Sequence, residues 1–317
     1  MALTATVDVE LKIRHSVPQR REPTKWRRIM YAITGITGKV GGAMARALLA
    51  AGQPVRAIVR DATKGRQWAA LGCDVAIATM EDAEALTQAF KGATAVFILP
   101  PPVFDPEPFY PEAQAVIDSV ATALRAAKPA RVVCLSTVGA DAVQDNLLSQ
   151  HTKMETALSA LPLALTLLRP AWFLDNVAWD VSSARGAGLI HSFLAPTGRA
   201  LPMVAAEDVG RVAATLIQQD WSGTRIVELE GPERVSPDDL AAAFTTVLGK
   251  PVRAVPVPRE TWEALFRSQG MRNPQPRMRM LDGFNEGWIA FADEARTIKG
   301  TISATTVVQA LVAGEGA

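Results

Sequence analysis

The sequence predicts an α/β protein whose central sheet is parallel and doubly wound, with helices on both faces. Short apolar runs that barely alternate recur along the chain, which is typical of strands buried on both faces. The segments between these runs have the period of amphipathic helices, and repeated strand–helix–strand units imply right-handed crossovers between parallel strands. The predicted strands span residues 29–34, 55–59, 74–78, 95–99, 131–136 and 164–169.

The helices are predicted from their apolar stripes and from signals at their ends. From Val40 to Ala51 the apolar residues fall on one helical face, and Gly52 follows as a C-cap. Ser236 is a typical N-cap, and Pro237 stands at the first position of a helix over 236–248. A further strand is predicted over 225–229, and the other helices over 63–71, 82–91, 110–127, 150–160, 172–184 and 207–218.

Three parts are expected along the chain. Residues 1–28 are rich in Lys and Arg and have no long apolar run, which favours a flexible extension over a secretory signal. Residues 29–170 carry the regular alternation of strands and helices. Residues 171–317 have a looser pattern, which predicts a smaller α/β lobe whose strands and helices return to the core. Within that lobe, 258–292 is expected to cover the carboxyl ends of the strands.

Charge and composition exclude several classes of partner. The formal net charge is +1, which gives no electrostatic case for nucleic acid or an anionic membrane. No apolar run reaches the roughly 18–20 residues of a membrane span. The two cysteines, Cys73 and Cys134, match no metal spacing, and no metal is expected. A cytoplasmic protein with reduced thiols fits these features.

The first predicted strand ends in a glycine-rich turn, Thr34–Gly41. Glycine allows the tight turn at position 35, close approach of a pyrophosphate at 38, and close helix–sheet packing at 41. Free N–H groups at the start of the helix bind the phosphate, and the Thr37 hydroxyl adds a donor. Between a buried strand and an amphipathic helix, this spacing predicts Rossmann-type dinucleotide binding. The expected contacts in this turn are Gly35, Thr37, Gly38, Lys39, Val40 and Gly41.

The end of the second strand bears on which dinucleotide binds. An acid at this point bonds the ribose hydroxyls of NAD, whereas an arginine holds the 2′-phosphate of NADP. Arg60 ends the strand and Lys64 lies nearby, although Asp61 follows at once. NADP(H) is therefore expected to be preferred, with NAD(H) possible. The alternative is that these residues are solvated surface charges without a cofactor role.

Further motifs follow the glycine turn in a fixed order. They are Val55–Asp61, Ala95–Pro102, Leu135–Ala140, Leu167–Asn176 and Gly231–Pro232. In this order, over residues 29–255, the chain resembles the NmrA-like branch of atypical short-chain dehydrogenases. The set His151, Glu155 and Arg169–Pro170 is similar to the pattern of type 2 NAD(P)H quinone oxidoreductases and azo-dye reductases within that branch.

The resemblance implies cofactor contacts beyond the glycine turn. At the nicotinamide half these are Leu99, Pro100, Ser136 and Lys153, and the strand ends add Thr137 and Pro170. The Ser136 and Thr137 hydroxyls are expected to face either nicotinamide or substrate. One departure from the family concerns Thr79–Asp82, where Gly-Asp-Leu is usual, so the carboxylate near the adenine is displaced or missing.

The residues also limit the chemistry. Short-chain dehydrogenases that reduce ketones use a Tyr as proton donor with a Lys four residues later. The two tyrosines, Tyr31 and Tyr110, are followed at that spacing by Gly35 and Gln114, which argues against an alcohol dehydrogenase or an epimerase. Quinones, azo bonds and conjugated double bonds are already electrophilic, so alignment with the cofactor matters more than an acid.

Several residues are candidates for the substrate side. His151 is a candidate proton donor or substrate anchor, and a structural histidine is the alternative. Lys153 either bonds ribose hydroxyls or points to solvent. Asn176 either anchors substrate or caps a local turn. A flat acceptor needs an apolar cleft, and the residues expected to line it, each with ordinary core packing as the alternative, are Pro101, Phe104, Trp172, Phe173 and Trp262.

The sequence therefore favours an NAD(P)H-dependent reductase that passes hydride to a quinone, azo or similar conjugated acceptor. The alternative is a non-catalytic sensor of the NAD(P) pool that acts through a protein partner, because the lack of a Tyr–Lys pair fits such a protein equally well. The expected partner of a reductase is a small aromatic or conjugated substrate. The sequence sets no oligomeric state.

Overall fold

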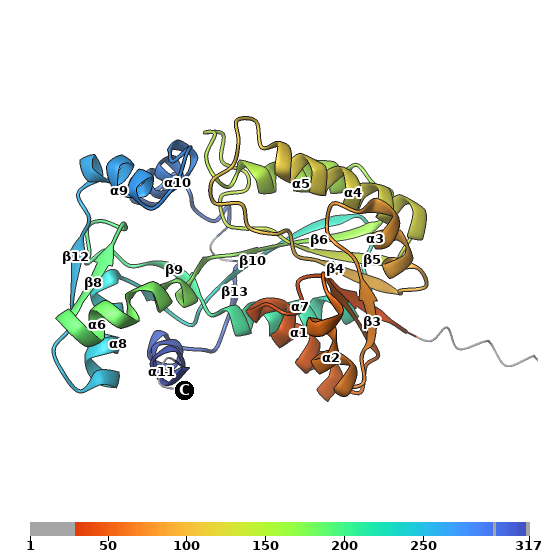
Figure 1. Ribbon diagram of the computed structural model, residues 1–317, viewed down its shortest axis with the longest axis horizontal. Helices are drawn as coiled ribbons and strands as arrows, with labels where there is room; N and C mark the ends of the chain where they lie inside the picture. The colour runs from red at the N-terminus through yellow and green to blue at the C-terminus, as the bar shows by residue number, and fades with distance from the viewer. Residues whose placement is uncertain (1–28, 294–295, 315–317) are drawn as a thin grey trace, which may run out of the picture.

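The computed structural model describes residues 29–293 and 296–314. The extension predicted over 1–28 lies outside the described residues. Figure 1 shows a central sheet with helices above and below it and a lobe at one end. No helix in the described ranges is long and apolar enough to cross a membrane.

The sheet has eight strands in the order β13-β10-β6-β5-β4-β1-β2-β3, and every pairing in it is parallel. This confirms the predicted fold class. The central strands β1, β4, β5 and β6 are almost wholly buried, because helices cover both faces of the sheet. The strands are β1 Tyr31–Ile33, β2 Val55–Val59, β3 Asp74–Ile77, β4 Ala95–Ile98, β5 Arg131–Leu135, β6 Ala164–Pro170, β10 Thr224–Glu230 and β13 Ile298–Lys299.

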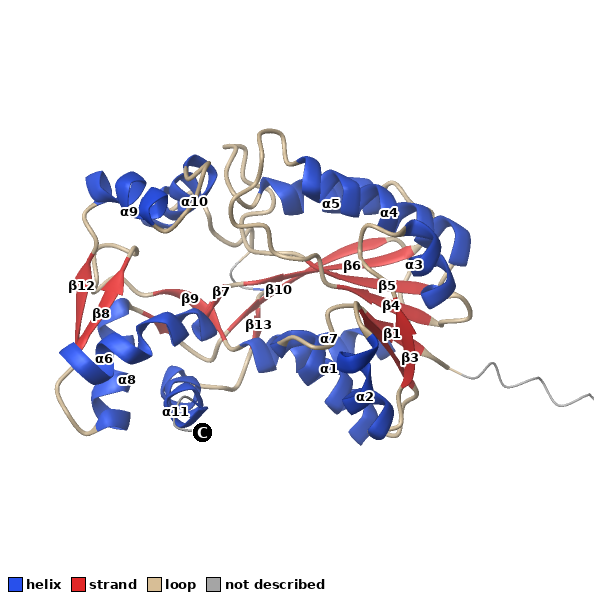
Figure 2. Cartoon of the chain, in the orientation of Figure 1, coloured by secondary structure: helices blue, strands red, loops and turns tan. Residues whose placement is uncertain are grey.

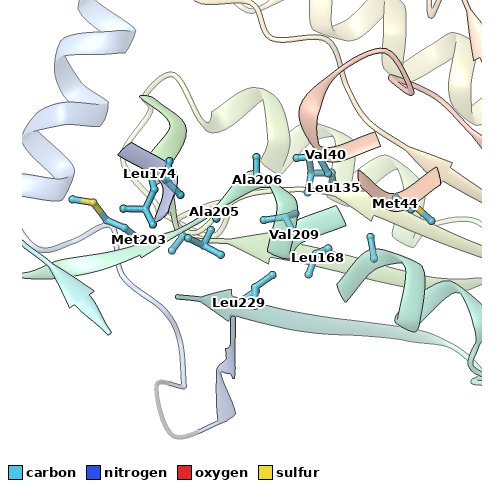
Figure 3. Close-up of a cluster of buried hydrophobic side chains, with 14 of the residues drawn as sticks. Val40, Met44, Leu135, Leu168, Leu174, Met203, Ala205, Ala206, Val209 and Leu229 are labelled. Carbon is cyan, nitrogen blue, oxygen red and sulfur yellow. The ribbon is translucent and has the colours of Figure 1, made fainter. Parts of the chain in front are cut away.

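Helices cover both faces of the sheet, as Figure 2 shows. On one face lie α1 (Lys39–Ala50), α2 (Ala62–Ala70) and α7 (Ala206–Gln218). The other face carries the helices α3 Ala83–Phe90, α4 Pro111–Ala127 and α5 Ser149–Ser159. The first face packs tightly because α7 has a glycine where it crosses α1: a Cβ on Gly210 would lie 2.5 Å from the Val40 carbonyl oxygen. Figure 3 shows part of this core, in which Val40, Met44 and Val209 belong to the same buried cluster as Leu135 and Leu168 of the sheet.

The lobe is built from short elements around two small sheets, β11-β9-β7 and β12-β8. The helix predicted over 172–184 was wrong at its start, because Trp172 and Phe173 form a strand that pairs with Met203 and Val204. The elements are β7 Trp172–Phe173, η1 Leu174–Asp180, α6 Val181–Ala187, β8 Leu189–Ser192, β9 Leu201–Val204, β11 Arg234–Val235, α8 Pro237–Leu248, β12 Arg253–Pro256, η2 Arg259–Thr261, α9 Trp262–Ser268, α10 Gln275–Glu286 and α11 Ala304–Gly314.

The start of α8 follows the predicted capping chemistry. The Ser236 side chain accepts the Asp239 N–H at 3.1 Å, and the Asp239 carboxylate accepts the Ser236 N–H at 2.9 Å, with Pro237 at the first helical position. This reciprocal pair satisfies two backbone donors that the helix itself leaves unpaired. The residues after Pro170 divide between lobe and core, since α7, β10 and β13 complete the layers of the main sheet.

Candidate functional site

The site forms where the chain turns in opposite directions from two neighbouring strands. Strands β1 and β4 lie side by side, and open α/β sheets bind ligands at the carboxyl ends of such a pair. The Thr34 hydroxyl donates to the Phe97 carbonyl at 3.1 Å and accepts the Leu99 N–H at 2.8 Å. Thr34, which the sequence analysis did not single out, therefore fixes the two strand ends against each other.

The glycine turn leaves no room for side chains at two positions. Gly35 has φ = +64°, in the left-handed region, and a Cβ there would lie 3.0 Å from the Leu99 Cβ. A Cβ on Gly41 would lie 2.4 Å from the Gly35 carbonyl oxygen, well inside contact distance. Helix α1 can therefore start directly against the turn only because both residues are glycine.

The start of α1 offers backbone donors to an anion. Gly38 is the N-cap and provides no side-chain cap, and the first N–H groups of a helix have no partner within it. A Cβ on Gly38 would meet nothing closer than 3.4 Å, and Thr37 and Lys39 on either side are exposed. The Val40 side chain is instead buried in the core. This cradle, with open donors and no side chain over it, fits the pyrophosphate of a dinucleotide.

The acid beside Arg60 is used by the protein itself. Asp61 is the N-cap of α2, and its carboxylate accepts the Thr63 N–H at 2.7 Å and the Lys64 N–H at 3.2 Å. These backbone bonds lower the pKa of Asp61. Arg60 and Lys64 are exposed at the end of β2 and in the first turn of α2. Of the charged residues at the end of β2, Asp61 therefore caps a helix, and Arg60 and Lys64 are exposed cations.

A buried ion-pair network joins Arg169 of β6 to residues of α5 and of the loop that follows β5. The Arg169 guanidinium donates to both Glu155 carboxylate oxygens, at 2.9 and 2.6 Å, and to Asp141 at 2.8 Å. Burial opposes the charged form, but the bonds and charges of Glu155 and Asp141 raise the pKa of Arg169. The Ser136 hydroxyl donates to Glu155 at 2.5 Å. The hydrogen of the Ser136 hydroxyl is therefore used in a bond within the network. The Thr137 hydroxyl donates to the Val138 carbonyl at 3.1 Å.

His151 lies one helical turn before Glu155 on α5 and is half-buried. It lines a small cavity between α4 and α5, beside the proline loop that follows β4. Burial lowers the pKa of His151 to about 4, despite the attraction of Glu155. The imidazole is therefore neutral at pH 7 and can anchor a ligand through an N–H or a ring nitrogen, but it holds no imidazolium proton. The cavity is lined by Pro100, Pro101, Val103, Ala113, Val116, Ile117, Gln150, His151 and Met154.

The His151 shift predicts a pH-dependent stability. The folded pKa of about 4 lies below the ordinary value of 6.5, so the unfolded chain binds more protons between these pH values. The free energy of unfolding should therefore fall as the pH drops through that window. His151→Gln should flatten this part of the profile, measured by urea unfolding at about pH 7.5 and about pH 5. An unchanged difference between the two pH values would contradict the assignment.

The remaining predicted residues divide between open and packed positions. Lys153 is exposed on α5, Leu99 and Pro101 are half-buried, and Pro170 is buried at the end of β6. Phe104 is 53% exposed on the loop after β4. The predicted residues Trp172, Phe173 and Asn176, on the first segments of the lobe, are also half-buried.

Trp262 lies elsewhere. It is 2% exposed and packs in a separate core of the lobe with Phe266, Met278 and Leu281. Its indole N–H donates to the Val257 carbonyl at 2.9 Å. An exposed face is needed to line an open cleft, so the packing alternative accounts for Trp262. The sequence around Trp262 did not distinguish a residue that lines a cleft from one that packs in the core.

The lobe is tied to the loops that follow β4 and β5. Asp105 accepts the Arg272 and Asn273 N–H groups at 2.9 and 2.7 Å. The Leu147 N–H donates to the Pro276 carbonyl at 2.9 Å. The start of α10 and the loop before it are therefore bonded to these loops at the carboxyl ends of the strands, whereas α9 lies farther out in the lobe (Figure 1). Within the described residues, no three His, Cys, Asp or Glu side chains gather as a metal site would require.

The same edge holds a strained pair that the sequence did not reveal. Phe109 and Tyr110 both have positive φ, 69° and 61°, which is unusual for bulky residues. Tyr110 is held by its hydroxyl, which donates to Asp145 at 3.0 Å and to the Asn146 carbonyl at 2.8 Å. Phe109 is left 88% exposed. Strain of this kind persists only where neighbouring contacts enforce it.

Several known proteins are similar to this chain. The NAD(P)H azoreductase of Xenophilus azovorans is 26% identical over 246 residues, covering 76% of this chain and 82% of that protein. Quinone oxidoreductase 2 of Escherichia coli is 26% identical over 245 residues, covering 76% and 82%. A crystal structure of an NADPH-dependent quinone oxidoreductase of Escherichia coli, complexed with NADPH, has a TM-score of 0.74 at 24% identity and covers 89% of this chain and 99% of that one.

The family assignment rests on the whole core rather than on one motif. The model of the NmrA-like family matches residues 29–283, from just before the first strand of the sheet to near the end of α10. That range contains the glycine turn, the buried ion-pair network and the segments of the lobe nearest the sheet. The resemblance inferred from the motifs is confirmed, and the protein belongs to the NmrA-like family.

Proposed function

We propose that this protein is a reductase that binds NADPH in preference to NADH and passes hydride to a quinone, azo or similar conjugated acceptor. The observation that carries the proposal is the open cradle at Gly35–Gly41, at the carboxyl ends of β1 and β4, with Arg60 free at the end of β2. The azoreductase and quinone oxidoreductase similarity supports the same class of reaction.

The cofactor would be held at two anionic points. The N–H groups at the start of α1 and the Thr37 hydroxyl bind the pyrophosphate. Arg60 and Lys64 bind the 2′-phosphate, since the Asp61 carboxylate that would otherwise oppose it is engaged with α2. The related crystal structure complexed with NADPH supports this choice of dinucleotide. When bound, NADPH supplies the hydride.

The acceptor would lie between the loops after β4 and β5 and the first segments of the lobe. Pro101, Phe104, Trp172 and Phe173 supply apolar surface for a flat ring, and Asn176 supplies a polar anchor. The neutral His151 can anchor the acceptor through an N–H or a ring nitrogen but has no imidazolium proton to donate. The chain has no Tyr-x-x-x-Lys motif, so the reduced product takes its proton from water. Catalysis then consists chiefly of aligning the acceptor with the cofactor.

The test is a turnover assay with purified protein. NADPH absorbance is followed with a small panel of quinones and azo dyes, and NADH is run in parallel. Steady oxidation that requires both protein and acceptor is the expected result. NADPH binding without turnover on any acceptor would contradict the reductase and favour the sensor alternative, whose signature is cofactor-dependent binding to a protein partner.

The cofactor preference has its own prediction. Arg60→Ala should raise the Kd for NADPH by about tenfold or more, because one charge-assisted contact to the 2′-phosphate is lost, and should leave the Kd for NADH unchanged. Both are measured by fluorescence titration. Arg66→Ala is the matched control, since Arg66 is also exposed on α2. Equal losses for NADPH and NADH would contradict the 2′-phosphate role.

A further inference from the structure

One ion pair joins the cofactor turn to the lobe. The Lys39 ammonium lies 2.8 Å from an Asp175 carboxylate oxygen, across 136 positions of sequence. Lys39 is the first residue of α1, and Asp175 lies in η1, directly after the strand formed by Trp172 and Phe173. The pair thus connects the pyrophosphate cradle to the segment that faces the acceptor.

Asp175 is the fixed member of this pair. Its second carboxylate oxygen accepts the N–H of Ala206, the first residue of α7, at 2.8 Å. The N-cap of that helix is Ala205, which has no side-chain acceptor, so Asp175 supplies the cap. Its side chain is only 18% exposed, whereas the Lys39 side chain is 57% exposed. Lys39, on a flexible four-carbon stem, is therefore the member that can change partners.

A phosphate bound at the start of α1 would lie beside the same ammonium. Lys39 begins this helix, and its neighbours supply the backbone donors of the cradle. One cation then faces two anions, the Asp175 carboxylate and the pyrophosphate. The carboxylate attracts the ammonium away from the phosphates and also repels the phosphates directly. Both effects lower the affinity for the dinucleotide.

We propose that Asp175 sets the affinity for the dinucleotide by competing with its pyrophosphate for Lys39. This rests on the proposed NAD(P)H cofactor. Because NADPH and NADH share the pyrophosphate, Asp175 acts equally on both, in contrast to Arg60. The pair is partly exposed, and such pairs are weak, so the expected changes are several-fold rather than thousands-fold.

The test measures Kd for NADPH and NADH in Asp175→Asn, Lys39→Met and the double variant. Asparagine keeps an oxygen for the Ala206 N–H and removes the charge. Asp175→Asn should tighten both cofactors by about three- to tenfold and by the same factor. Lys39→Met should weaken both. In the Lys39→Met background the Asp175→Asn gain should shrink, since the competition for Lys39 is gone.

The controls separate this proposal from the cofactor assignment. Glu207→Gln removes the same charge from the first turn of α7, where Glu207 pairs with Arg211, and should leave both Kd values unchanged. Asp175→Ser is the second variant if the asparagine form unfolds, because a hydroxyl also caps a helix start. Unchanged or weaker cofactor binding in the folded Asp175→Asn and Asp175→Ser variants would overturn the role of Asp175 alone. Absence of binding in the wild type would overturn the cofactor assignment and this role together.

Discussion

Glu155→Gln is expected to lower the free energy of unfolding by about 3–5 kcal/mol, because it removes the main charge partner of a buried cation. Arg169 is 4% exposed and Glu155 is 7% exposed, so water cannot replace the lost carboxylate. Asp141 remains as a partner, but it reaches only one nitrogen of the guanidinium. Urea unfolding at neutral pH measures the change.

A matched exposed pair provides the control. Glu263 accepts from Arg267 at 2.9 Å on α9, and both side chains are about half exposed. Glu263→Gln should change stability by no more than about 0.5 kcal/mol, since exposed helix pairs contribute little. Equal changes in the free energy of unfolding for Glu155→Gln and Glu263→Gln would contradict the burial of the ion-pair network around Arg169.

Gly41→Ala is the second change with a large expected effect. Its Cβ would lie 2.4 Å from the Gly35 carbonyl oxygen and 2.9 Å from the Ile36 Cα, both backbone atoms. Backbone cannot rotate away as a side chain can, so α1 must move off the turn. We expect a loss of about 3 kcal/mol or more in stability, together with loss of NADPH binding. Thermal unfolding and fluorescence titration measure the two effects.

Substitutions at two other glycines test whether the effect of Gly41→Ala comes from the clash of its Cβ with the turn. Gly186 in α6 has open space around it, so Gly186→Ala should leave stability unchanged or raise it slightly. Gly38→Ala should leave the fold intact, because its Cβ meets nothing closer than 3.4 Å, but should weaken cofactor binding by crowding the phosphates. A stable Gly41→Ala variant that binds NADPH normally would contradict the geometry of the cradle.

The sequence was most informative where local pattern and burial agree. The first six strands were predicted to within two residues at each end, because parallel strands buried on both faces are continuous apolar runs. The glycine turn was also placed correctly, because its glycine spacing predicts a dinucleotide-binding turn only between a strand and a helix. The N-cap Ser236 is also a local signal, as is Gly52, which has positive φ directly after Ala51, the C-cap of α1.

The rest depends on contacts between distant residues. The Ser136 hydroxyl was expected to face nicotinamide or substrate, yet Glu155, 19 positions away, takes its hydrogen. Nothing near Lys39 in the sequence points to Asp175. Trp172 and Phe173 fitted a helical pattern, but pairing with β9 makes them a strand. Propensity and periodicity are silent on such pairings, which only the assembled fold creates.

If this site aligns the nicotinamide of NADPH with a conjugated acceptor for direct hydride transfer, only one of the two hydrogens at C4 of the nicotinamide is transferred. A single-turnover reaction measures this selectivity. Protein loaded with NADPH that carries deuterium at one of the two C4 positions is mixed with a quinone, and the absorbance loss is timed against unlabelled NADPH. Slower oxidation for one of the two C4 positions only is the result expected from a fixed alignment. Equal rates for both labelled forms and for unlabelled NADPH, or no oxidation, would contradict it.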